Sequence, residues 1–349
     1  MIQLKQLELA AGKTTADGTP RESVTAPGTG GASARYRAGR ATSDHSTAGG
    51  MVSGEADIES LYSTMREAAG LLGITCSRDR VWPALTAFQD VISSTVVFNA
   101  VTSGGRIKDV SFDFTMPPSA GDPYEIALAR GLAEETSHPV RALFSDIQKR
   151  LPVSAYGVDY GITRGFNKTY IVFPLGGFQD LAALADVPSI PAGLSEHLST
   201  FARYGLDGKV SAIAIDYAHR TWNVYFNGLG AEQVERETVL SMVHEFGLPE
   251  PSGQLLDFIA TSSAMYPTFG WDSSRIERIS FSVRTTDPAA LLSRAEPMLE
   301  KFARSVPYAY EGDRVLVYAG AMSADEEYYK LATYYRMTPE TQGRVRPAN

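Results

Sequence analysis

The sequence has little cysteine, no excess of positive charge and no long apolar run. Cys76 is the only cysteine among 349 residues, so no disulfide forms within the chain and a zinc site built from cysteines is excluded. The chain has 40 acidic against 32 basic residues and a net charge of −8, which disfavours binding to nucleic-acid phosphates. No apolar run approaches the roughly 20 residues of a spanning helix, and the N-terminus lacks the apolar stretch of a secretory signal. We expect a cytoplasmic protein with no nucleic-acid or membrane partner.

The first 50 residues are also poor in aromatic side chains, since Tyr36 is the only one. They are rich in Gly, Ala, Ser and Thr, and such a segment buries too little apolar area to offset the entropy lost on ordering. Apolar residues such as Leu61 and Met65 recur at helical spacing only after this segment. We therefore predict a disordered extension over 1–50 and one folded domain over 51–349.

Segments of β-strand character occur in five pairs in the predicted domain, and each pair is typical of a hairpin. The pairs are 95–102 with 110–116, 153–161 with 168–174, 210–217 with 221–226, 264–271 with 278–285, and 314–322 with 328–336. An amphipathic helical stretch precedes each pair, at 55–94, 124–151, 180–206, 231–262 and 287–306. The pattern predicts an α+β fold made of five repeats of two helices and two strands.

Ten antiparallel strands in an open sheet would leave exposed edges, whereas closure into a barrel removes them. We predict a closed ten-stranded barrel ringed by helices, with a lumen wide enough for a ligand. Two alternatives stay open at this point. The sheet could be open, with helices on one side only, or residues 328–336 could form a helix that begins with a capping box of Ser323 and Glu326.

The alternation along the predicted strands separates a polar face from an apolar one. In KTYIVFP, Lys168 and Tyr170 share one face while Ile171 and Phe173 share the other. The segments VSFDFTM, TWNVYF and RISFSV divide in the same way. If helices cover the apolar faces, cations, hydroxyls and tyrosines line the lumen.

A lumen of this composition suits the ionisation of an allylic diphosphate. Clustered cations form charge-assisted hydrogen bonds with a diphosphate, and tyrosine rings stabilise a carbocation by about 0.5–2 kcal/mol each. This combination predicts a site that breaks the bond to diphosphate and shields the resulting cation until a nucleophile attacks.

Several short motifs give the chain a resemblance to a known family. They are EAAGLLG (67–73), GDPY (121–124), HPV (138–140), FARYGLD (201–207), MYPT (265–268), VPYAY (306–310) and EEYYKL (326–331). On these stretches the chain resembles the ABBA-fold (PT-barrel) aromatic prenyltransferases, specifically the NphB/CloQ group. The resemblance implies a ten-stranded antiparallel barrel ringed by helices. It also implies transfer of an isoprenoid from its diphosphate to an electron-rich aromatic ring, by a Friedel-Crafts-type substitution in secondary metabolism.

The resemblance also implies the site residues. Those that match prenyl-diphosphate positions are Lys168, His219, Asn223, Tyr225, Tyr266, Arg278 and Lys330. Among them Lys168, Arg278 and Lys330, together with Tyr170, are the expected catalytic residues. Those expected to line the prenyl and aromatic pocket are Ser111, Asp113, Tyr170, Ser211, Ala264, Ser282 and Tyr334.

Two positions depart from the family pattern. Ser111 stands where magnesium-dependent members place an aspartate, and Asp113 follows two residues later on the same face. His219 replaces a lysine and is a weaker fixed cation at neutral pH. We therefore expect an enzyme that binds no metal and requires no cofactor, although Ser111 alone does not exclude Mg²⁺.

The sequence alone does not determine which aromatic acceptor is used or how long the prenyl chain of the donor is. The expected partners are a dimethylallyl, geranyl or farnesyl diphosphate and an aromatic acceptor such as a polyhydroxynaphthalene. A phenazine or a phenol of the hydroxyphenylpyruvate type is the alternative acceptor, and a non-catalytic barrel that binds prenylated or aromatic ligands is the alternative function. Because a closed barrel has no free strand edge, we expect a monomer.

Overall fold

The computed structural model describes residues 54–92, 95–287, 297–337 and 341. The extension predicted over 1–50 lies outside these residues. The described strands are β1 (Val96–Ser103), β2 (Arg106–Met116), β3 (Ala155–Gly161), β4 (Gly165–Val172), β5 (Val210–Asp216), β6 (Thr221–Asn227), β7 (Ala264–Gly270), β8 (Ile276–Thr285), β9 (Leu316–Ser323) and β10 (Glu327–Arg336). Each corresponds to one strand predicted from the sequence.

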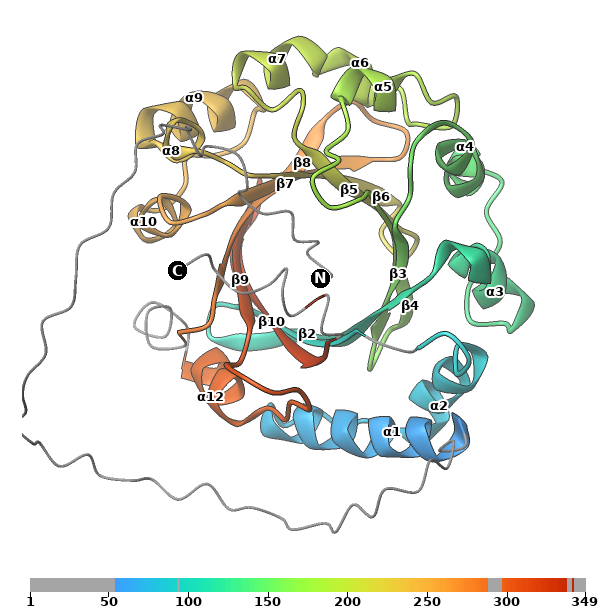
Figure 1. Cartoon of the computed structure of the whole chain (residues 1–349). Helices are drawn as coiled ribbons and strands as arrows, with labels where there is room; N and C mark the ends of the chain where they lie inside the picture. Colours follow the sequence, from blue (N-terminus) through green and yellow to red (C-terminus); the bar gives the residue numbers. More distant parts are fainter. Residues whose placement is uncertain (1–53, 93–94, 288–296, 338–340, 342–349) are drawn as a thin grey trace, which may run out of the picture.

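The ten strands form one closed barrel (Figure 1). Every strand pairs antiparallel with its neighbours in the chain, and β1 closes the barrel by pairing with β10. The closing pair aligns Ala100 with Leu331 and Val101 with Lys330. Closure confirms the predicted barrel, and the open sheet considered as an alternative is wrong.

The helices lie around the outside of the barrel (Figure 1). They are α1 (Gly54–Leu71), α2 (Arg78–Ala87), α3 (Pro123–Ala129), α4 (Leu143–Arg150), α5 (Leu181–Ala185), α6 (Gly193–Glu196), α7 (Leu198–Arg203), α8 (Ala231–Val234), α9 (Arg236–Glu245), α10 (Gly253–Ile259) and α12 (Pro297–Ser305). Two 3₁₀ turns, Pro118–Ala120 and Pro139–Ala142, precede α3 and α4.

The predicted helical stretches are broken into shorter helices than the repeat suggests. The first one splits into α1 and α2 because Gly73, at φ 71°, ends α1 in the left-handed region that glycine tolerates. The third and fourth stretches each contain three helices in place of the expected two. Of the fifth stretch, α12 is described, while 288–296 lie outside the described residues.

Residues 328–336 form a strand, so the helix alternative is wrong. Ser323 does act as a local hydrogen-bond acceptor, because its Oγ accepts from the backbone N–H groups of Asp325 (3.3 Å) and Glu326 (3.2 Å). Its own N–H donates to the carbonyl of Glu326 at 3.0 Å. These bonds close the tight turn between β9 and β10 in place of starting a helix.

The apolar faces of the strands pack against the helices. Phe201 of α7 lies 5.1 Å from Phe226 of β6 and 5.6 Å from Phe246 at the end of α9, measured between ring centroids. Phe112 and Trp222 are fully buried on the same side of the barrel wall. Because this large core lies between barrel and helices, the polar strand faces point into the lumen, as predicted.

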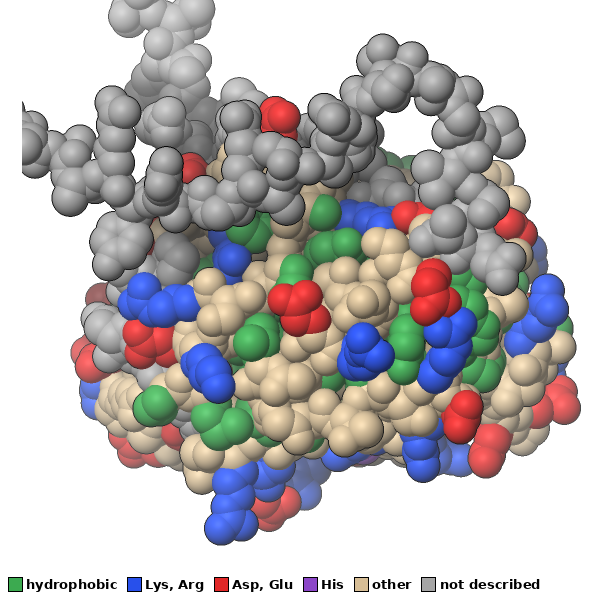
Figure 2. Space-filling model, turned by 90° about the horizontal axis from the view of Figure 1, so that it is seen from below, with side chains coloured by type: hydrophobic (Ala, Val, Ile, Leu, Met, Phe, Trp, Pro, Cys, Tyr) green, Lys and Arg blue, Asp and Glu red, His purple; other side chains and the backbone are tan. Residues whose placement is uncertain are grey.

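The outer surface carries charges of both signs. Figure 2 shows basic and acidic side chains interspersed over the face seen from below, without a patch of one sign. Within the described part of the chain, none of the helices combines the length and the apolar character needed to cross a membrane.

Candidate active site

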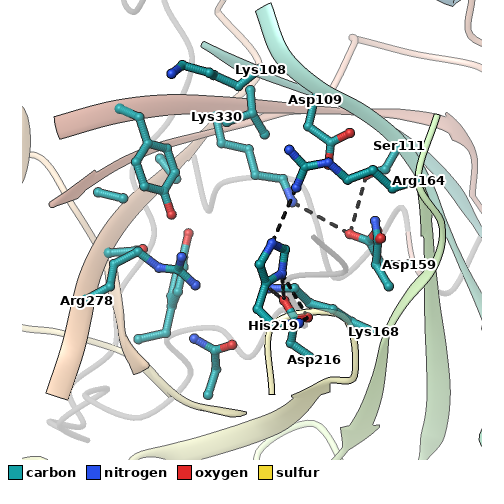
Figure 3. Close-up of a pocket in the computed structure, with 18 of the residues that line it drawn as sticks. Lys108, Asp109, Ser111, Asp159, Arg164, Lys168, Asp216, His219, Arg278 and Lys330 are labelled. Carbon is teal, nitrogen blue, oxygen red and sulfur yellow. Dashed lines mark hydrogen bonds and ion pairs between the residues drawn. The ribbon is translucent and has the colours of Figure 1, made fainter. Parts of the chain in front are cut away.

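One end of the lumen holds a polar cavity of about 400 Å³ (Figure 3). Volumes of this order are typical of small-molecule sites. Of the residues predicted from the sequence, the cavity is lined by Ser111, Lys168, Tyr170, His219, Asn223, Tyr225, Tyr266, Arg278 and Lys330. The barrel therefore brings together residues from six different strands and one turn in a single chamber.

Lys168 is held by a buried aspartate. Its Nζ lies 3.0 Å from Oδ2 of Asp216, which is 2% exposed, because β4 and β5 align these two residues directly. His219 approaches the same carboxylate with its backbone N–H at 2.9 Å and its Nδ1 at 3.1 Å. Burial by itself would raise the pKa of Asp216, but the Lys168 ammonium and the contacts from His219 hold that pKa well below its usual range.

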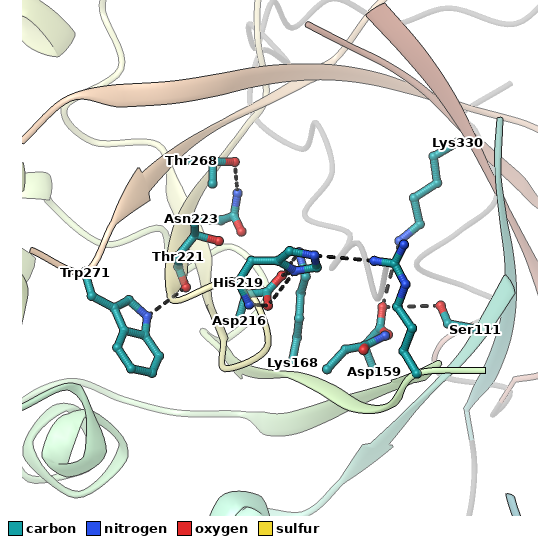
Figure 4. Close-up of polar contacts among 12 residues, drawn as sticks. Ser111, Asp159, Lys168, Asp216, His219, Thr221, Asn223, Thr268, Trp271 and Lys330 are labelled. Carbon is teal, nitrogen blue, oxygen red and sulfur yellow. Dashed lines mark hydrogen bonds and ion pairs between the residues drawn. The ribbon is translucent and has the colours of Figure 1, made fainter. Parts of the chain in front are cut away.

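Lys330 has a similar partner on β3, the strand next to the one that carries Lys168. Its Nζ lies 3.9 Å from Oδ2 of Asp159, a buried carboxylate on β3. Asn167 donates to the other oxygen of Asp159 at 2.9 Å, and Ser111 donates to Oδ2 at 3.4 Å. Figure 4 shows both acidic groups beside the lysines that they hold. Each carboxylate fixes one lysine at the cavity wall.

Arg278 is a less compensated cation. In the part of the chain that the structure describes, it forms an ion pair with none of the carboxylates, and its guanidinium lies 5.9 Å from the Tyr328 ring centroid. Its side chain extends from β8 into the lumen, and its guanidinium group faces the cavity (Figure 3). An unpaired guanidinium in a half-buried site is a strong attractor for a multivalent anion.

Sequence reasoning missed six charged groups that line this cavity: Lys108, Asp109, Asp159, Arg164, Asp216 and Glu326. Arg164 lies in the turn between β3 and β4, and its Nη1 is 3.4 Å from Nε2 of His219 (Figures 3 and 4). A turn has no alternation to indicate where its side chains point. Strand alternation alone does not show that Asp216 lies beside Lys168. That contact follows from the register in which β4 and β5 pair.

Three tyrosines form the next layer of the lumen. The rings of Tyr225 and Tyr266 stack at 4.7 Å and 22°, and Tyr170 meets Tyr225 at 6.2 Å and 61°. Burial raises the pKa of all three phenols above the usual value. They consequently stay neutral and offer ring faces and hydroxyl donors.

Asn223 lines the cavity, but its amide nitrogen is directed at the barrel wall. It donates to Oγ1 of Thr268 at 2.5 Å and to the Pro267 carbonyl at 3.4 Å. Its buried Oδ1 has no hydrogen-bond partner among the described residues. A contact from its amide N–H to a diphosphate therefore requires rotation of the amide.

The remaining predicted pocket residues lie outside the cavity: Asp113, Ser211, Ala264, Ser282 and Tyr334. Ser282 is close to it, since its side chain hydrogen-bonds Tyr266 and its backbone aligns with Ala264. Ser211 instead donates to the Tyr225 carbonyl at 3.1 Å and accepts from Asn227.

Asp113 and Tyr334 are both buried on the lumen side of the wall, further from the cavity. Tyr334 lies in an apolar cluster with Val97 and Val317, and Asp113 aligns with Val97 across β1 and β2.

Two of the four acidic residues that line the cavity contact Lys168 or Lys330. Asp159 and Asp216 each pair with a lysine. Ser111 donates its hydroxyl to Oδ2 of Asp159. Among the described residues, no three His, Cys, Asp or Glu side chains are grouped so as to hold a metal ion.

Comparisons with known proteins show the family of the chain. The chain is 43% identical over 293 residues to a flaviolin linalyltransferase of Streptomyces virginiae, covering 84% of this chain and 97% of that protein. It is 44% identical over 281 residues to a furaquinocin biosynthesis prenyltransferase of Streptomyces sp. (strain KO-3988), covering 80% and 91%. It is 38% identical over 286 residues to a 5,10-dihydrophenazine-1-carboxylate 9-dimethylallyltransferase of Streptomyces anulatus, covering 82% and 95%. Residues 56–342 match the family described as Aromatic prenyltransferase Orf2, and the chain belongs to this family of aromatic prenyltransferases.

Proposed function

We propose that this chain transfers an isoprenoid from its diphosphate to an electron-rich hydroxylated naphthalene or naphthoquinone, without a metal ion. The observation that carries the proposal is the convergence of Lys168, Arg278 and Lys330 on one chamber whose next layer is Tyr170, Tyr225 and Tyr266. The names of two relatives, which mention flaviolin and furaquinocin, support a polyketide-derived acceptor.

The diphosphate binds among the cations. Lys168, Arg278 and Lys330 approach it from three walls, and they stabilise the negative charge that grows on the leaving group as the C–O bond breaks. Asp216 and Asp159 act as positioning residues, because they fix the two ammonium groups before the substrate arrives. Arg164 lies beside His219 and adds positive charge at the position where the family lysine is missing.

The tyrosine layer receives the allylic cation. The stacked pair Tyr225 and Tyr266 and the tilted Tyr170 present π faces to a carbocation, at about 0.5–2 kcal/mol per well-placed ring. Their neutral hydroxyls provide no anionic nucleophile that would trap it. The barrel wall limits the access of water, which would otherwise yield a prenyl alcohol.

The acceptor then attacks through a ring carbon. The C–O electron pair leaves with the diphosphate, a new C–C bond forms, and the arenium ion loses its ring proton to the released diphosphate. Because the cations already neutralise the leaving group, this sequence needs no metal ion. Since the barrel is closed and offers no strand edge for pairing, we also propose that the enzyme acts as a monomer.

The test is a product assay with the full chain. Purified protein is incubated with flaviolin or 1,6-dihydroxynaphthalene and with dimethylallyl, geranyl or farnesyl diphosphate, in EDTA or in Mg²⁺, and products are read by mass spectrometry. A prenyl-shifted acceptor in EDTA supports the whole proposal. Product only with Mg²⁺ overturns metal independence. Saturable binding without product on these acceptors, on a phenazine and on a hydroxyphenylpyruvate overturns the transfer itself and leaves a binding barrel.

A further inference from the structure

The lumen carries a second arginine on β8, away from the diphosphate cavity. Arg284 lies six residues after Arg278, and strand alternation places Arg278, Ser280, Ser282 and Arg284 on the same face. Arg278 and Ser280 line the cavity, so this face is the lumen face. Arg284 aligns with Val317 of β9, which belongs to the apolar cluster on the lumen side of the wall.

Arg284 is too far along the strand to share the diphosphate with Arg278. Six residues of strand separate the two Cα atoms by about 20 Å. Ser282 lies between them and hydrogen-bonds Tyr266, the tyrosine next to the cavity. Any anion held by Arg284 is thus a different group, located beyond the tyrosine layer.

Among the described residues, the side chains near Arg284 are mainly apolar, and they form a cluster of Val97, Val315, Val317, Ala332, Tyr334 and Met337. The buried carboxylate of Asp113 lies across β1 and β2 from Val97 of the same cluster. Burial lowers the pKa of Arg284 to about 10, so that it still carries its charge at neutral pH. Burial also raises the pKa of Tyr334 to about 12, and this phenol therefore supplies no negative charge.

The guanidinium has unused hydrogen-bonding capacity. Its Nε is buried and has no hydrogen-bond partner, and no ion pair joins Arg284 to a carboxylate in the part of the chain that the structure describes. A cation left in this state costs free energy unless an anion or hydrogen-bond acceptor arrives with a ligand. The residue as a whole is half-buried, and it is not fully enclosed by the protein.

We propose that Arg284 binds an anionic oxygen of the aromatic acceptor, either a carboxylate or the enolate of a hydroxyquinone. This inference rests on the proposed function, since it assumes that the acceptor occupies the lumen between Arg284 and the tyrosines. The two arginines of β8 then bind different substrates. Arg278 holds the anion of the donor, and Arg284 orients the acceptor by the oxygen furthest from the reacting carbon.

The experiment compares acceptors that differ in charge. The anionic probes are 6-hydroxy-2-naphthoate and 2-hydroxy-1,4-naphthoquinone, and the neutral probe is 2,6-dihydroxynaphthalene. Dissociation constants are measured by quenching of protein fluorescence without donor, and turnover is measured with geranyl diphosphate. The variants are Arg284→Gln, Arg284→Lys and, as a control for loss of a surface charge, Arg304→Gln on α12, whose partner Glu300 is exposed.

We expect Arg284→Gln to weaken binding of the anionic probes at least tenfold and to change binding of the neutral probe and the KM for geranyl diphosphate less than twofold. Arg284→Lys recovers part of the loss, and Arg304→Gln matches the wild type. The difference between the two anionic probes identifies which oxygen is preferred. Equal weakening of all probes, or none, overturns the inference, because a purely structural arginine does not distinguish charge.

Failure of the proposed function gives a different result. A wild type that binds the anionic probes through Arg284 but prenylates no acceptor contradicts prenyl transfer and leaves the anion site intact. A wild type that prenylates 2,6-dihydroxynaphthalene, together with an Arg284→Gln variant that binds 6-hydroxy-2-naphthoate normally, contradicts only the role of Arg284.

Discussion

The two ends of the lumen differ in how their charges are compensated. At the cavity end, Lys168 and Lys330 are paired with buried carboxylates, and Arg278 and Arg164 add further positive charge. At the other end, Arg284 is surrounded by an apolar cluster and pairs with no described carboxylate. The cavity end therefore holds its lysines in place before a ligand binds. At the other end, the charge of Arg284 is compensated only when an anionic ligand binds, as we propose.

Removal of a cavity lysine should have the largest effect. Lys168→Ala and Lys330→Ala each remove a group that stabilises the leaving diphosphate, and we expect kcat/KM to fall about 10²–10³-fold. Steady-state kinetics with geranyl diphosphate measures this fall, and thermal melting shows whether the variant stays folded. Lys149→Ala, an exposed lysine on α4, is the matched control. Turnover within threefold of the wild type would remove that lysine from the mechanism.

Filling the lumen beyond the tyrosines should separate donors by length. Ala264 aligns with Ser282 next to Tyr266, so Ala264→Phe places a ring where a longer prenyl chain must pass. We expect at least a tenfold loss of kcat/KM with geranyl and farnesyl diphosphate and a smaller loss with dimethylallyl diphosphate. Competition assays with mixed donors give the ratio directly. An equal loss with all three donors would show that Ala264 does not face the prenyl chain.

A carboxylate at position 111 should change the metal response of the cavity end. Ser111 neighbours Asp159, and Ser111→Asp adds a second negative charge near the diphosphate. We expect activity in EDTA to fall about tenfold and to be restored by Mg²⁺, while Ser111→Ala stays insensitive to both. The readout is initial rate against Mg²⁺ concentration. A variant with the same rate in EDTA and Mg²⁺ would contradict this placement.

The buried pair of Asp216 and Lys168 should make part of the stability pH-dependent. The pKa of Asp216 is below that of an unfolded aspartate, so the pair stabilises the fold above about pH 3.9 and that stabilisation is lost as the pH falls further. Asp216→Asn should cost about 1–3 kcal/mol at pH 7 and less at pH 3. Denaturant unfolding of both proteins at several pH values measures the difference. A difference that does not change with pH would contradict the assignment.

The smallest effect is expected at Arg164, because this side chain is exposed at the cavity rim. Arg164→Gln should raise the KM for the prenyl diphosphate about two- to fivefold at low salt, and less at high salt, where exposed charges are screened. His219→Lys in the same background should recover the loss by restoring a cation beside Asp216. No dependence on salt would indicate that Arg164 does not act through its charge.

The fold was predictable because its signals are local. Each strand shows its own alternation, and residues 328–336, for which a helix was the alternative, form the predicted strand and are rich in Tyr and Thr, which favour β-structure. The helices were predicted less well, since the glycine turns that break them, as at Gly73, depend on short-range geometry that periodicity does not report. The lysines and tyrosines of the chamber followed from the polar faces and the family resemblance.

The sequence by itself determined the barrel, its polar lumen and most of the cations and tyrosines that face it. The reason is that the alternation of polar and apolar residues is a local property of each strand. Only the tertiary structure decided which acid meets which base. Lys330 and Asp159 are separated by 171 residues, and their contact depends on barrel closure and strand register. The same closure leaves Arg284 among apolar side chains. Pairing across a barrel depends on the register of every strand between the two groups, and no single strand encodes it.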